Sequence, residues 1–136
     1  MENKKIKWLI YTVLIGLIPI ITRLFVWGVT KSGATNLLAA SDIIAFGLVL
    51  HVSIINEIEH LSAEDKSWKT IQNGMSIIFI AIYCVLSTLV MLNEKFSSFI
   101  DDSALRICTI ALAIVSMILS YTIFDRISKS FKKEIK

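Results

Sequence analysis

Two charged residues lie inside apolar segments, where a charge is costly. Arg23 stands in LIPIITRLFVWGV and Asp42 in LLAASDIIAFGLVL. A charge at the bilayer centre costs ~2.5–3.5 kcal/mol on insertion scales, so each requires a partner or water. Both are equally far from a turn between Ser32 and Gly33, which places them about 8–9 Å below the outer ends of two antiparallel helices. We predict that they pair or line a water path; the alternative is that Arg23 snorkels to the headgroups.

A stripe on the segment after this turn alternates in polarity. At about 100° per residue, its polar members fall within about 40° of one direction; they are Asp42, Ser53, Asn56 and His60. Ala45, Phe46 and Val49 lie between them. A water path with a hydrophobic constriction at Phe46 and Val49 has this pattern, and so does a packing face whose polar groups bond to neighbouring helices. His51 points the opposite way and is expected to be a hydrogen-bonding packing residue.

No catalytic or metal-binding pattern accompanies these residues. Glu57, Glu59 and His60 form EIEH, which is not the HExxH of zinc peptidases, and no second histidine lies nearby. Cys84 and Cys108 lie in apolar runs without a CxxC motif, and we interpret them as small packing residues. We therefore predict no enzyme activity, no catalytic residue, no metal and no cofactor.

Four apolar segments must position the polar residues. The chain has 136 residues, 55% of them hydrophobic, and its charges gather at the two ends and in three short gaps. A bilayer core needs about 20 residues of helix, and runs such as SIIFIAIYCVL lack the alternation of a membrane barrel. The prediction is an all-α membrane protein, a single domain over 1–136. Its four transmembrane helices, at about 8–29, 37–60, 63–92 and 103–124, form an antiparallel up-down bundle.

Local signals refine these elements. Gly33 is expected to end the first helix and Asn36 to cap the second, while Ser62 and Asp65 resemble a capping box. Asp101, Asp102 and Ser103 are expected to start the fourth helix, and Pro19 to kink the first. Small or polar residues at helical spacing predict helix–helix seams; they are Asn73, Ser76, Cys84 and Ser87 in the third helix, and Thr109, Ala113, Ser116 and Ser120 in the fourth.

The basic residues predict the orientation. Ten of the 14 Lys and Arg residues lie at the two ends or in the second gap, and three lie in the other two gaps. The positive-inside rule then places both termini in the cytoplasm. A reporter fused to the C-terminus, active only on one side of the membrane, is expected to report the cytoplasm. A periplasmic signal would invert the topology.

In its size, four spans, inner termini and run SDIIAFGLVLHVSIINEIEH, the chain resembles small membrane effectors of bacterial anti-phage defence, of the Hailong effector type. A looser analogue is the phage-exclusion membrane protein that depolarises cells. The resemblance implies an oligomeric ion channel in a bacterial inner membrane. It also implies that a nucleotide or oligonucleotide made by a partner nucleotidyltransferase holds the channel shut until infection.

Other functions remain open from the residues. A small transporter would use Asp42 as its proton or cation site, and a membrane scaffold subunit would transport nothing. The expected partners are the lipid bilayer and further copies of the chain. Duplex nucleic acid is not expected, because no basic stripe runs through the sequence.

Overall fold

The computed structural model describes residues 4–60, 66–96 and 98–134. The first helical stretch consists of α1 (Lys4–Trp8), a π-helical turn η1 (Leu9–Val13) and α2 (Leu14–Val29), and we call it helix one. It is followed by α3 (Ala40–Glu59), α4 (Lys66–Lys95) and α5 (Asp102–Glu134). Four helices within the described residues are long and apolar enough to cross a membrane, as the sequence predicts.

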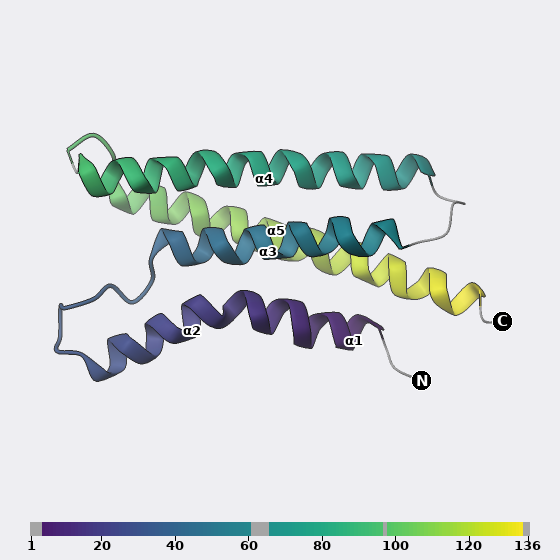
Figure 1. The fold of residues 1–136 in the computed structure, drawn as a ribbon, viewed down its shortest axis with the longest axis horizontal. Coiled ribbons are helices and arrows are strands. Elements are labelled where there is room, and N and C mark those ends of the chain that lie inside the picture. Colours follow the sequence, from purple (N-terminus) through teal and green to yellow (C-terminus); the bar gives the residue numbers. More distant parts are fainter. Residues whose placement is uncertain (1–3, 61–65, 97, 135–136) are drawn as a thin grey trace.

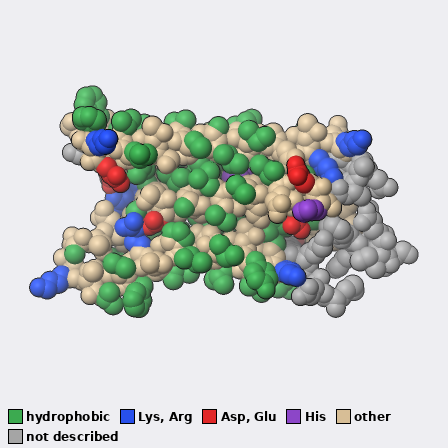
Figure 2. All heavy atoms as spheres, in the orientation of Figure 1, with side chains coloured by type: hydrophobic (Ala, Val, Ile, Leu, Met, Phe, Trp, Pro, Cys, Tyr) green, Lys and Arg blue, Asp and Glu red, His purple; other side chains and the backbone are tan. Residues whose placement is uncertain are grey.

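The helices lie side by side, and both chain ends lie at the same end of the molecule (Figure 1). The central element is α3, which packs against helix one, α4 and α5. Figure 2 shows hydrophobic side chains over the middle of one face and charged side chains mainly toward its two ends. This distribution suits a bundle whose middle lies in hydrocarbon.

The core lies where α3 meets α5 and the start of helix one. Leu50, Ile54 and Ile58 of α3 are completely buried. The ring of Trp8 stacks on that of Phe124, with centroids 4.0 Å apart. Helix one bends along its length (Figure 1), and it contains both a π-helical turn and Pro19, which are recognised causes of helix bending.

The connection between helix one and α3 differs from the prediction. Helix one ends at Val29, where the backbone N–H of Thr30 donates to Val26 O at 3.0 Å. Gly33 lies within the connection at φ 86°, the left-handed region that glycine favours. α3 begins at Ala40 rather than at position 37. Asn36 therefore does not cap it, because Ala39 occupies the N-cap position and makes no side-chain hydrogen bond.

The later helices extend beyond their predicted ends. α4 reaches Lys95, whereas its predicted start and the proposed capping box fall in 61–65, outside the described residues. α5 continues ten residues past the predicted end at Phe124. Ile127 is buried there and Arg126 lies over the ring of Trp68, 4.5 Å from its centroid. Packing and a cation–π contact thus continue the helix after its apolar run has ended.

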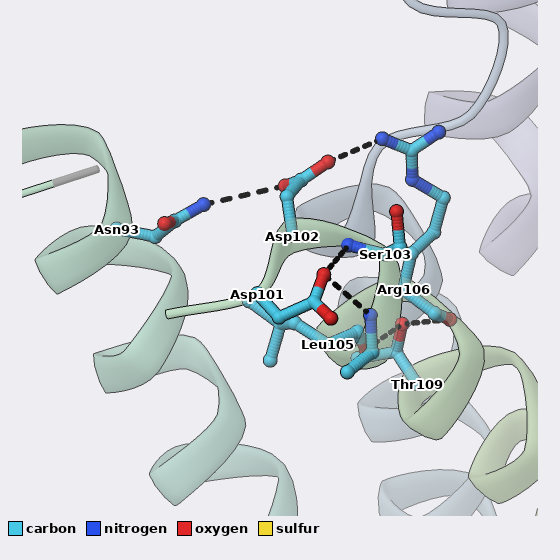
Figure 3. Close-up of polar contacts among 8 residues, drawn as sticks. Asn93, Asp101, Asp102, Ser103, Leu105, Arg106 and Thr109 are labelled. Atoms are coloured by element: carbon cyan, nitrogen blue, oxygen red, sulfur yellow. Dashed lines mark hydrogen bonds and ion pairs between the residues drawn. The ribbon is translucent and has the colours of Figure 1, made fainter. Parts of the chain in front are cut away.

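Asp101 caps the start of α5 (Figure 3). Its Oδ1 accepts hydrogen bonds from the backbone N–H groups of Ser103 at 2.9 Å and Ala104 at 3.3 Å. Asp102 pairs with Arg106 one turn later and accepts a hydrogen bond from Asn93 Nδ2 at the end of α4. The predicted helix start is confirmed, because the Asp101 carboxylate satisfies two backbone N–H groups that the first turn leaves unpaired.

The predicted seam is confirmed for α5 and only in part for α4. Thr109, Ala113, Ser116 and Ser120 are all buried, with 0–7% of each exposed. In α4, Ser76 is buried and Asn73 and Ser87 are half-buried, whereas Cys84 is exposed. Tyr83 is the residue of α4 that faces α3, where it lies against Gly47. Because successive residues of a helix are about 100° apart, Cys84 points away from α3. Cys108 is also exposed, so the packing interpretation of both cysteines is wrong.

Candidate functional site

The outer part of the seam between helix one and α3 holds an ion pair. Arg23 Nε of α2 donates to Asp42 Oδ2 at the start of α3. The side chains are 32% and 15% exposed, so the pair is largely shielded by protein. The predicted pairing is confirmed, whereas the predicted depth of Asp42, about 8–9 Å below the end of its helix, is wrong, because α3 begins at Ala40 and Asp42 lies in its first turn. The ion pair compensates each charge for the loss of water in an apolar span.

The middle of the same seam is apolar and closely packed. Gly16 of α2 lies against Phe46 and Val49 of α3: a methyl group at Gly16 would lie 2.9 Å from Phe46 Cδ2 and 3.4 Å from Val49 Cγ1. Phe46 belongs to the buried core and Val49 is half-buried. The two residues predicted to form a constriction thus close the space between helix one and α3.

The inner part of the seam is polar. Trp8 Nε1 donates to Ser53 Oγ at 3.1 Å, and Thr12 Oγ1 lies 3.1 Å from the same oxygen. Sequence reasoning named Ser53 but missed both partners, although Trp8 and Thr12 are one helical turn apart and therefore share a face. Asn56 and His60 are exposed. His60 lies at the C-cap of α3.

Two adjoining hollows on this inner part form one groove, which we call the inner groove. An apolar hollow of about 520 Å³ is lined by Ile15, Leu48, Val49 and Val52. A polar hollow of about 340 Å³ is lined by Lys7, Trp8 and Glu57. Tyr11, Thr12, Ser53 and Asn56 line both. The inner groove is therefore amphipathic, with charged residues at one end and aliphatic residues at the other.

The predicted stripe is thus divided along the seam. Asp42, Phe46, Val49 and Ser53 all face helix one, through the ion pair, the contact at Gly16 and the bonds from Trp8 and Thr12. Asn56 faces the inner groove. His60 does not line either hollow. The seam runs from a charged outer part through an apolar middle to a polar inner part.

A buried polar cluster on the opposite side of α3 was only partly predicted. His51 Nε2 and Tyr83 Oη each lie 2.9 Å from Ser116 Oγ, and the His51 ring stacks on Phe79. The interpretation of His51 as a hydrogen-bonding packing residue is confirmed, whereas Tyr83 was missed. A serine beside a histidine resembles a nucleophile with its base. Ser116 is completely buried, and the two hydrogen bonds join α3 and α4 to α5.

Within the described residues, no three His, Cys, Asp or Glu side chains gather closely enough to hold a metal ion. The chemistry available along the seam is therefore that of an ion pair, hydroxyl and amide groups, and the charges of Lys7 and Glu57. These groups can bind ions, water or charged headgroups.

Comparison with protein-family models, with curated proteins and with solved structures gave no match to this chain.

Proposed function

We propose that the chain is a subunit of an oligomeric membrane channel, held closed along the seam between helix one and α3. The observation that supports this most directly is the order of groups along the seam. A charged pair and a polar groove are separated by the contact of Gly16 with Phe46 and Val49. Channels that gate by dewetting place such a hydrophobic constriction between polar vestibules.

Helix one is suited to be the moving part. Gly16 is the buried residue of α2, and large side chains such as Phe25 are exposed at 72%. α2 packs less extensively against α3 than α4 or α5 does, so its separation from α3 would cost less packing than movement of either of those helices. The exposed faces of helix one also offer surface to lipid and to further subunits. We propose a symmetric oligomer, because four helices enclose too little space for both a core and a water path.

The direction and control of the channel are part of the same proposal. With ten of the 14 basic residues toward the end that carries the termini, the inner groove lies on the cytoplasmic side of a bacterial inner membrane. The resemblance to anti-phage effectors supplies the proposed role, which is depolarisation of the infected cell. It also supplies the proposed control, a nucleotide or oligonucleotide ligand from a partner nucleotidyltransferase.

Ion flux in liposomes tests the proposal through Val49→Ser. A hydroxyl group at the contact with Gly16 favours entry of water into the constriction. The variant is therefore expected to leak ions at least about tenfold faster than the parent. A tenfold change corresponds to a barrier that is lower by ~1.4 kcal/mol. In cells, its expression should collapse the membrane potential. The matched control is Val85→Ser, at a 61% exposed position of α4 away from the seam.

The possible outcomes separate the three classes of function. Passive flux that rises in Val49→Ser but not in Val85→Ser supports the channel, and crosslinking in the same membranes should trap dimers or larger species. Proton flux that requires a transported substrate would instead indicate a transporter that uses Asp42. If no variant conducts ions although the protein is present in the membrane at normal levels, the result would indicate a scaffold subunit. Monomers alone after crosslinking would contradict the oligomeric channel.

A further inference from the structure

The inner groove has the length of one membrane leaflet. α3 has 20 residues, which is about 30 Å of helix and close to the thickness of a bilayer core. Leu48, at the deep end of the groove, lies eleven residues before Glu59 at the end of the helix. That separation is about 16 Å, or roughly half of the core. The groove therefore begins at one membrane surface and ends near the midplane.

The lining of the inner groove changes from charged to polar to apolar with depth, and a lipid molecule changes in the same order from its headgroup to its acyl chains. Lys7 and Glu57 lie at the surface end, followed by the hydroxyl and amide groups of Thr12, Ser53 and Asn56. Ile15 and Val52 lie at the deep end, and they are 54% and 58% exposed toward the surroundings of the helices. A volume of about 520 Å³ for the apolar hollow is within the range of small-molecule sites.

We infer that the inner groove binds one phosphatidylethanolamine molecule from the leaflet at the end of the bundle that carries the termini. Lys7 is placed to contact the phosphate group, and the Glu57 carboxylate is placed to contact the ammonium group. One acyl chain lies along Ile15, Leu48 and Val52. Phosphatidylglycerol offers a phosphate but no cation, so it leaves Glu57 without a partner. A bound lipid would fill the open side of the seam, whether or not the protein conducts ions.

Native mass spectrometry of the full-length protein tests this inference. The protein in mild detergent is mixed with equal amounts of phosphatidylethanolamine, phosphatidylglycerol and cardiolipin. We expect one phosphatidylethanolamine per subunit to be retained about two- to fivefold better than phosphatidylglycerol. This is the difference in affinity that one partly exposed ion pair, between Glu57 and the ammonium group, would supply. Glu57→Gln should remove this preference. Val52→Trp fills the apolar hollow and should reduce the lipid adduct about tenfold.

The control for Val52→Trp is Ile77→Trp, which adds the same ring at a 60% exposed position of α4 outside the groove. It should retain lipid as the parent does. Equal retention in Val52→Trp and Ile77→Trp would overturn the groove assignment, and equal retention of all three lipids would overturn the headgroup assignment. Because binding is measured without ion flux, a non-conducting protein that retains phosphatidylethanolamine would contradict the channel but not the lipid site.

Discussion

Replacing Gly47 by alanine is expected to lower the free energy of unfolding by about 2–4 kcal/mol, from overpacking together with a lost hydrogen bond. A methyl group at Gly47 would overlap Cζ and Oη of Tyr83. Tyr83 is completely buried and bonded to Ser116 of α5, so it cannot move aside without breaking this hydrogen bond between α4 and α5. Thermal unfolding of the purified protein in detergent, followed by size-exclusion chromatography, measures the loss.

Gly74→Ala is the matched control, because it makes the same change inside α4 where no atom lies within 4 Å of the added methyl group. It should be neutral or stabilise the helix by up to about 1 kcal/mol. Tyr83→Phe separates the two causes, since it removes the hydroxyl group and keeps the ring. Tyr83→Phe should lower the free energy of unfolding by about 1 kcal/mol. If Gly47→Ala unfolded at the temperature of the parent, the close packing of Tyr83 on α3 would be wrong.

Asp42→Asn is expected to reduce the amount of folded protein in the membrane severalfold. The amide still accepts a hydrogen bond, but Arg23 keeps a positive charge in an apolar span with no opposite charge. The cost is about 1–2 kcal/mol, below the ~2.5–3.5 kcal/mol of an unpaired charge at the bilayer centre, because Arg23 is 32% exposed. Membrane levels and the folded fraction after extraction in detergent measure this loss.

The double variant Arg23→Gln with Asp42→Asn removes both charges and should recover the folded fraction, because neither span then contains an unpaired charge. Glu94→Gln, at an exposed position at the end of α4, is the matched control and should change little. Normal folding of Asp42→Asn would show that the ion pair contributes nothing to assembly. If the double variant folds but its flux has a different ion preference, the pair also lies on the ion path.

The four spans and several local features follow from sequence alone. Long apolar runs identify the spans, because a bilayer accepts only segments whose backbone is satisfied internally. Asp101 predicts the start of α5, because an N-cap side chain bonds to backbone N–H groups only two or three residues later in the chain. The pairing of Arg23 and Asp42 could be predicted from their equal distance in sequence from the turn at Gly33, but the depth of Asp42 could not, because α3 begins at Ala40 and places Asp42 in its first turn.

Only tertiary structure decided which faces of these helices meet. Composition does not distinguish Tyr83 from Cys84 as the residue of α4 that faces α3, because lipid and core are equally apolar. The cluster of His51, Tyr83 and Ser116 joins three helices whose contacts span 33 and 65 residues of sequence. α5 extends past its apolar run because Ile127 and Arg126 find partners on other helices. The inner groove likewise exists only as a space between helix one and α3, and its shape depends on how two distant segments pack.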